Sequence, residues 1–474
     1  MKKILMVLMG LEIGGAETHV VELSLTLQKR GWEVLVASNG GVYEKTLEEH
    51  GIRHFSVPTH TRSPKMMRRA YVALEQIIRQ EKPDIVHAHA RIPAFLCGKL
   101  QKKLGFPFVT TAHGVFRINP MLRFLSNWGR QTLAVSEDIR EYLIDRYDLP
   151  AGQIHVISNG IDTAAFSPEH SGKEARAEFQ IPEDVPVVAC VTRLQPNNSL
   201  AAELLLASAA ALAEQNQGLR ILLVGDGERL EPFKQQAAAI NQKLGYPCVV
   251  MTGGRTDVAR LVAACDVFVG VSRAALEAMS AGKPTVLCGN AGYGGIAREE
   301  AAAANLASNY CCRGNRMGTA VELTADIQTL LTMPKEQRIA IGMEDRGIVE
   351  RDFSLNAMVR NCETVYQLAL QPKRRVVVSG YYGYENLGDE TILSTICSRY
   401  REQYDLVVLS KQPHLTEKKF GVTAISRFHM IKVQRAIRGC DLLISGGGSL
   451  LQDRTSTRSL MYYLSVMHLA QRKK

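Results

Sequence analysis

The feature that most constrains this 474-residue chain is a regular alternation of short apolar runs with amphipathic stretches of helical length. No apolar run reaches the roughly 18 residues that a membrane-spanning helix needs. An alternation of this kind is typical of parallel β-sheets covered by helices. The sequence therefore predicts an α/β protein.

The alternation divides into three units. The first occupies residues 1–165 and the second 180–333, and a helical pattern at 334–370 is expected to pack back on the first unit. A basic, turn-forming linker at 371–375 precedes a partial third α/β unit at 376–474. The strands predicted in the first two units are Ile4–Met9, Val34–Ala37, Ile85–His87, Val109–Ala112, Leu133–Val135, Val187–Val191, Ile221–Val224, Val249–Thr252, Val267–Val271 and Thr285–Cys288.

Cysteine spacing and the N-terminal residues indicate the compartment. The ten cysteines are scattered, and no C-x-x-C pair provides the spacing of a zinc site. The apolar run Ile4–Leu11 could be mistaken for a signal peptide, but Glu12 interrupts it and no small-residue cleavage site follows. A first buried strand in a reduced, cytoplasmic protein is the favoured interpretation. We expect no metal site, and the absence of a nucleic-acid-binding motif predicts no nucleic-acid partner.

A glycine pair follows the first predicted strand and opens a helix. Gly14 and Gly15 would let a backbone come close to a ligand, and the free amides of a helix N-terminus favour phosphate. Tight turns use such pairs as well, so the pair alone does not establish a site. Most of the chain's other polar motifs also follow predicted strands, where open α/β sheets bind ligands. These motifs are Thr111–Gly114, Val135–Glu137, Asn159–Asp162, Thr192–Leu194, Val224–Gly227, Thr252–Gly253 and Leu276–Pro284.

Taken in this order, the motifs resemble glycosyltransferase family 4, the retaining GT-B enzymes, over about residues 1–370. The resemblance implies two Rossmann-like domains facing across a cleft, with a sugar nucleotide held mostly by the second. It implies no cofactor apart from the donor substrate, for which a UDP-sugar is favoured.

The resemblance also implies roles for single residues. Glu277 would bind the ribose hydroxyls, Arg193 would clamp the diphosphate, and His113 would lie beside the transferred sugar. Backbone amides at Gly14 and Gly15 would reach the diphosphate. The remaining nucleotide-binding positions would be Gly225, Gly253 and Arg255, with the backbone of 253–255 holding the base.

These roles agree with the chemistry of sugar transfer. Breaking the bond to the nucleotide leaves negative charge on the diphosphate while the sugar approaches an oxocarbenium ion. Fixed positive groups aimed at that charge are the main catalytic contribution, and Arg193 with the helix N-terminus would replace a metal ion. Each residue also has a structural alternative. Arg193 would then be a surface ion-pair partner, Glu277 an acid in a first helical turn, and His113 a hydrogen-bonded core histidine.

Two departures from the family pattern affect the site. The usual glutamate eight positions before the ribose glutamate is missing, and Ser272-Arg273-Ala274 is instead similar to a turn in the inverting, lipid-linked N-acetylglucosaminyl transferase of peptidoglycan synthesis. Asn198 stands where the family has a lysine five residues after the diphosphate arginine. We expect Arg273 to replace that cation, and we name it with His113 and Arg193 as a candidate catalytic residue.

The third unit contains two further strand–glycine loop–helix patterns, at 377–390 and 441–453. With Ser410 and Ser426-Arg427 between them, they resemble the N-terminal part of polysaccharide pyruvyl transferases. Those enzymes are GT-B-like and move a pyruvyl group from phosphoenolpyruvate to a surface-polysaccharide sugar. We expect a truncated, inactive domain that associates the chain with cell-wall or surface polysaccharide.

The expected partners are a nucleotide sugar and a glycan or lipid-linked glycan acceptor. The densest basic cluster, within a net charge of +10, contains His60, Arg62, Lys65, Arg68 and Arg69. It is either a solvated helix face or a patch that contacts the inner face of the membrane peripherally. Three functions remain open: an active glycosyltransferase, a non-catalytic nucleotide-sugar-binding protein, and a pyruvyl transferase.

Overall fold

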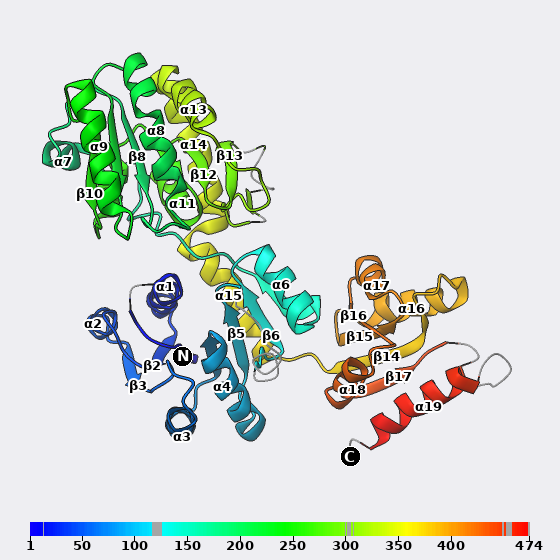
Figure 1. Ribbon diagram of the computed structural model, residues 1–474. Helices are drawn as coiled ribbons and strands as arrows, with labels where there is room; N and C mark the ends of the chain where they lie inside the picture. Colours follow the sequence, from blue (N-terminus) through cyan, green and yellow to red (C-terminus); the bar gives the residue numbers. More distant parts are fainter. Residues whose placement is uncertain are drawn as a thin grey trace.

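Three sheets of mainly parallel strands organise the protein (Figure 1). The computed structural model describes residues 1–12, 14–115, 126–298, 300, 305–306, 308–447, 450–451 and 457–472. Its helices cover the faces of the sheets, so the predicted α/β class is confirmed. No helix in these ranges is both long and apolar enough to cross a membrane.

The first sheet is fully parallel, with the order β3-β2-β1-β4-β5-β6-β7. The five strands predicted for this unit are present. Two further strands, β3 and β7, escaped prediction because they are short edge strands without an apolar run. The strands are β1 Lys3–Val7, β2 Glu33–Ser38, β3 Arg53–Ser56, β4 Ile85–His89, β5 Phe108–Ala112, β6 Gln131–Ala134 and β7 Ile154–Val156. The described helices are α1 Gly15–Lys29, α2 Glu44–Glu49, α3 Pro64–Glu81, α4 Arg91–Leu104 and α6 Glu137–Tyr147.

The second sheet has the order β10-β9-β8-β11-β12-β13, and only β13 is antiparallel. The glycine-rich β13 escaped prediction because it lacks an apolar run. The strands are β8 Val187–Val191, β9 Arg220–Val224, β10 Val249–Gly253, β11 Val267–Gly270, β12 Thr285–Gly289 and β13 Gly292–Ile296. The described helices are α7 Lys173–Glu178, α8 Leu200–Gln215, α9 Leu230–Leu244, α10 Val258–Ala263, α11 Ser272–Ser280, α13 Ala320–Thr332 and α14 Lys335–Ile348.

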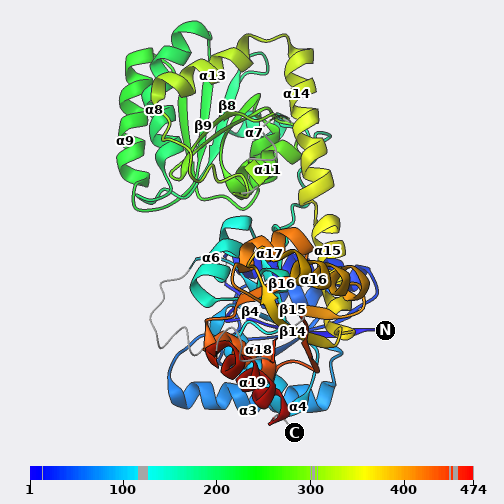
Figure 2. The ribbon, with the colours of Figure 1, turned by 90° about the vertical axis from the view of Figure 1, so that its right-hand side faces the viewer.

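The helical segment at 334–370 is shared between the two domains (Figure 2). Its first half, α14, packs on α11 of the second domain. A π-helical turn at Val349–Phe353 leads into α15, Leu355–Leu370, which packs against α1 in the core of the first domain. Only the second half of this segment therefore packs on the first domain, where the sequence pattern suggested the whole of it.

The third unit is a four-stranded parallel sheet beside the first domain, in the order β16-β15-β14-β17 (Figure 1). Its strands are β14 Arg375–Tyr382, β15 Asp405–Ser410, β16 Thr423–Ser426 and β17 Leu442–Ser445, and its described helices are α16 Leu387–Tyr400, α17 Pro413–Phe420, α18 Met430–Arg438 and α19 Thr457–Gln471. Polar contacts join it to the first domain: Lys432 Nζ lies 2.8 Å from Asp148, and Arg130 donates to the Gly439 carbonyl at 3.3 Å. A cavity of about 1030 Å³ lies between the two parts and is lined by residues of both.

We expect trypsin to cut first between the two parts, after Lys373 or Arg374. The segment 371–374 is exposed, and the few polar contacts that dock the third unit stabilise it weakly. The fragment that ends there should keep the nucleotide affinity of the whole chain. Limited proteolysis followed by calorimetry with UDP checks both statements, and a double glutamine variant at the two basic residues is the matched control. Resistance of the wild type to cutting, or loss of UDP binding after it, would show that the third unit is integral.

Candidate functional site

A cavity of about 760 Å³ lies at the carboxyl ends of the strands of the second sheet. The loops that follow β8, β9, β10 and β11 line it, which is where open α/β sheets bind ligands. Its volume is in the range of small-molecule and cofactor sites, roughly 300–1,000 Å³. Five of the predicted residues or their loops meet here: Arg193, Gly225, Arg255, Arg273 and Glu277.

Arg193 lines this cavity and has no ion-pair partner among the described residues. Its side chain is exposed, and it makes no ion pair or side-chain hydrogen bond with any residue that the structure describes. The alternative role of a surface ion-pair partner is therefore not seen. A free guanidinium with five donors can bind a phosphate in two-point fashion.

Glu277 lies deeper, with its side chain 12% exposed. Burial raises the pKa of its carboxyl, while Arg273 opposes that shift with a hydrogen bond from Nε at 2.8 Å. Because Arg273 precedes it by four residues, the two side chains lie on the same face of α11. Glu277, the predicted ribose ligand, is therefore already bonded to a cation on its own helix.

Arg273 also connects the two domains. Its guanidinium donates to the carboxylate of Glu22 on α1 at 2.7 and 3.2 Å. Burial by itself would lower the pKa of Arg273, but Glu22 and Glu277 raise it above its ordinary value. The sequence predicts that Arg273 supplies the positive charge that is missing at position 198, where the family has a lysine. In the structure the Arg273 guanidinium is instead bonded to the two carboxylates of Glu22 and Glu277.

A second ion pair crosses the domains, between Arg313 and Asp138 of α6. Arg313 lines the cavity, and Asp138 follows β6, so the carboxyl edges of the two sheets face each other. Glu22, Asp138 and Arg313 escaped sequence analysis. No local pattern separates an inter-domain acid from the many acids in first helical turns or on solvated faces.

The predicted glycines differ in whether the surrounding structure would tolerate a side chain at their positions. An added Cβ at Gly225 would lie 1.9 Å from the carbonyl oxygen of Thr192, so the two loops can pack only with glycine there. Gly253, at φ +73°, ends β10, and its neighbour Gly254 is the residue that lines the cavity. Gly14 precedes α1 without a side-chain cap, and a Cβ added at Gly15 would meet nothing within 4 Å.

Arg255 is ion-paired with two acidic residues. Its guanidinium donates to Asp257 at 2.8 Å and to Glu178 at 2.7 and 3.2 Å. The bond from Arg255 is the main reason that the pKa of Asp257 is lowered to about 2. Its side chain is therefore held in place at the cavity edge, and the backbone of this loop is the part available to a ligand.

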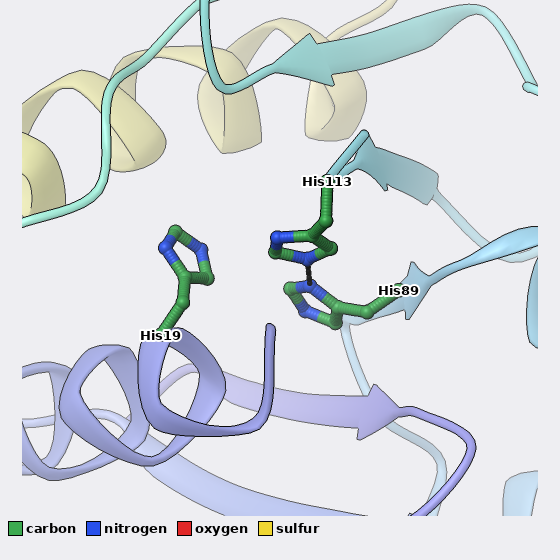
Figure 3. Close-up of side chains that lie close together, drawn as sticks. All are labelled: His19, His89 and His113. Atoms are coloured by element: carbon green, nitrogen blue, oxygen red, sulfur yellow. Dashed lines mark hydrogen bonds between the residues drawn. The ribbon is translucent and has the colours of Figure 1, made fainter. Parts of the chain in front are cut away.

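His113 belongs to a group of three histidines in the first domain (Figure 3). His19 comes from α1, His89 ends β4, and His113 follows β5. His89 Nδ1 and His113 Nε2 lie 3.0 Å apart, and the His19 ring centroid is 5.0 Å from that of His113. Burial lowers the pKa of all three, to about 4 for His19.

Only His113 of this group was predicted. A signal for His89 existed in the alternation of the strand, because His87 and His89 point to the same face of β4. His19 lies inside a helix, with no motif to mark it. The expectation that the chain has no metal site rested on spacing along the sequence, and these residues come from three separate elements.

Comparisons with known proteins assign both domains. A model described as Glycosyltransferase Family 4 matches residues 13–165, and one described as glycosyl transferases group 1 matches residues 185–311. The Escherichia coli UDP-Gal:alpha-D-GlcNAc-diphosphoundecaprenol alpha-1,3-galactosyltransferase is 26% identical over 282 residues, which cover 53% of this chain and 70% of that protein. An Arabidopsis thaliana sulfoquinovosyl transferase is 29% identical over 300 residues, 58% of this chain and 56% of its own length, so the chain spans little more than half of it.

A solved structure shows the same fold. The Anabaena protein HepE in complex with UDP superposes with a TM-score of 0.60 at 19% identity, over 78% of this chain and all of that one. At this identity the likeness establishes the architecture alone. Two domain families in this order, on two Rossmann-like sheets whose carboxyl edges face each other, identify the chain as a glycosyltransferase with the GT-B fold.

Proposed function

We propose that the chain transfers a sugar from a UDP-sugar to a lipid-linked or polysaccharide acceptor of the cell surface. The observation that best supports a sugar-nucleotide donor is the 760 Å³ cavity. It is lined by the guanidinium of Arg193, which has no acidic partner among the described residues, and by the carboxylate of Glu277. The UDP bound by HepE and the UDP-Gal in the name of the E. coli relative support uracil as the base of the donor. The diphosphoundecaprenol in that relative's name supports a lipid-linked acceptor.

In this proposal the donor's diphosphate lies between Arg193 and the amides at the start of α1, with Gly14 and Gly15. The ribose reaches Glu277, and the base lies against the loop that contains Gly225, Gly253 and the backbone of Arg255. His113 faces the sugar from the first domain. As the glycosidic bond breaks, charge grows on the diphosphate and the Arg193 guanidinium stabilises it.

Thermal shift tests this donor assignment. A ligand that binds only the folded state raises the melting temperature. We expect UDP and UDP-sugars to raise it more than ADP and GDP, and hydrolysis of the stabilising sugar nucleotide to follow. Stabilisation without hydrolysis or transfer would instead favour a non-catalytic binding protein, the alternative suggested by the missing family glutamate and by Asn198.

Replacing Glu277 with alanine should weaken UDP binding by roughly 1–3 kcal/mol, because it removes charge-assisted hydrogen bonds to the ribose. Isothermal titration calorimetry measures the change directly. Glu203→Ala is the matched control, since this exposed acid on α8 pairs with Arg229 and does not line the cavity. Unchanged affinity in the Glu277 variant would remove the residue from the donor site.

The basic face of α3 is proposed to contact an anionic membrane. Lys65, Arg68 and Arg69 are exposed and make no ion pair within the described part of the chain, and Val72 beside them is 47% exposed. These three cations border a shallow cavity of about 720 Å³. Cations near an anionic bilayer contribute about 1 kcal/mol each.

We therefore expect the chain to sediment with phosphatidylglycerol vesicles and not with phosphatidylcholine vesicles. Reversing the three α3 charges to glutamate should abolish sedimentation. The control reverses three exposed lysines of the second domain, Lys234, Lys243 and Lys335. Equal loss in both variants would show that net charge, and not the α3 face, determines the attraction.

Pyruvyl transfer by the third unit is the second candidate. It is favoured by the resemblance of the patterns at 377–390 and 441–453; the first of them forms a glycine turn after β14, where Asn386 caps α16 by accepting from the amides of Gly388 and Asp389. The described residues of this unit provide one sheet, whereas a GT-B-like cleft needs two. Consumption of phosphoenolpyruvate by the whole chain would establish this activity.

A further inference from the structure

Three imidazoles with unused nitrogens, two of them buried and one half-buried, lie together at the carboxyl edge of the first sheet (Figure 3). His19 and His89 are each 1% exposed, and His113 is half-buried. Nε2 of His89 and Nδ1 of His113 have no hydrogen-bond partner in the part of the chain that the structure describes, and neither ring nitrogen of His19 makes a well-aligned hydrogen bond there, although the Asn159 side chain lies close enough to oppose the lowering of the His19 pKa. One nitrogen from each ring lies within 4.8 Å of the other two.

His87, on the same strand, differs from these three because both of its ring nitrogens are hydrogen-bonded, as expected of a purely structural histidine. Its Nδ1 bonds the Tyr366 hydroxyl at 2.9 Å, and its Nε2 bonds the Thr111 hydroxyl at 2.7 Å. Native proteins satisfy nearly all buried polar atoms, and leaving one unsatisfied costs about 1–3 kcal/mol. Unsatisfied nitrogens on three neighbouring rings therefore indicate that a ligand belongs to this group.

The donor set determines the class of that ligand. Imidazole nitrogen is a preferred ligand of zinc and related transition metals, and three histidines with one open position are a known zinc arrangement. Tetrahedral zinc, with bonds of about 2.0–2.1 Å, places its ligand nitrogens about 3.3 Å apart. One nitrogen from each ring already lies within 4.8 Å of the other two, and a bound ion would take the place of the hydrogen bond that joins His89 Nδ1 to His113 Nε2 at 3.0 Å.

We propose that His19, His89 and His113 bind a zinc-class divalent ion, with the fourth position left for water or a hydroxyl. The inference rests on the three side chains and not on the proposed sugar transfer. Metal binding is measured without donor or acceptor, so its failure would leave the transferase assignment intact.

The test uses the full chain, stripped with a chelator and then titrated with Zn²⁺ in a calorimeter. We expect one equivalent to bind, and His19→Asn, His89→Asn and His113→Asn each to weaken binding at least about 100-fold, since even outer-shell changes cost 10–100-fold. His50→Asn, an exposed histidine on another surface, should bind as the wild type does. Absence of an equimolar site, or full affinity in the three variants, would overturn the proposal.

A second measurement does not depend on the folding of the variants. Co²⁺ added to the wild type should give the visible spectrum of a tetrahedral ion without a thiolate charge-transfer band. A thiolate band would assign the metal to cysteines and contradict the proposal. An unchanged spectrum at saturating Co²⁺ would overturn the proposal.

Discussion

Replacing Arg193 with alanine should lower turnover by about 100- to 1000-fold, the loss seen when one preorganised donor to a developing negative charge is removed. The donor's affinity should fall much less. In the bound donor the diphosphate carries part of the charge that it holds in the transition state, so the guanidinium contributes most as the bond breaks. The structure supports this role because Arg193 is free of acidic partners among the described residues and lines the cavity.

Initial rates at saturating and limiting UDP-sugar separate the two effects. Arg193→Lys keeps the charge and loses the fork of donors, so it should recover only part of the rate. A variant that raises KM and leaves kcat unchanged would show that Arg193 serves ground-state binding alone.

Arg273→Ala is the informative comparison. If this residue substituted for the family lysine, its loss would resemble that of Arg193. Its bonds to Glu22 and Glu277 predict instead a change in donor affinity. The variant releases Glu277, the predicted ribose ligand, and breaks one of the two ion pairs that join the domains among the described residues. Wild-type kinetics in this variant would exclude both roles.

Replacing Tyr366 with alanine should destabilise the first domain by about 3–5 kcal/mol, as other large buried aromatic truncations do. Tyr366 is fully buried on α15, its ring packs edge-on against Trp32, and its hydroxyl bonds His87. Removing it leaves a cavity and an unpaired imidazole nitrogen in the same place. The core of the first domain thus depends on a helix that follows the whole second domain in the chain.

Tryptophan fluorescence during urea unfolding reports this effect selectively, since the chain's two tryptophans, Trp32 and Trp128, both belong to the first domain. Tyr366→Phe keeps the ring and should lose only about 1–3 kcal/mol. A chain that ends at Gln371 retains α15 and should unfold as the full chain does. An unchanged midpoint in the alanine variant would mean that α15 does not stabilise the first domain.

Local periodicity determined much of this architecture from the sequence. Runs of three to six mainly apolar residues marked the central strands because those strands are buried on both faces. The edge strands β3 and β7 and the glycine-rich β13 lack such runs, and they became visible only in the structure. The polar motifs after β8, β9 and β11 could be assigned to one ligand edge because parallel strands place their carboxyl ends together.

What the sequence could not determine is which distant side chains meet. Arg273 and Glu22 are 251 residues apart, and Tyr366 and His87 are 279 apart. His19, His89 and His113 come from one helix and two strand ends. A residue's own neighbours encode its strand or helix, whereas these contacts depend on how two domains and a returning helix are packed. The sequence therefore determined the fold class and the residue types at the ligand edge. Tertiary packing alone paired Arg273 with Glu22, left Arg193 without an acidic partner among the described residues and gathered the three histidines.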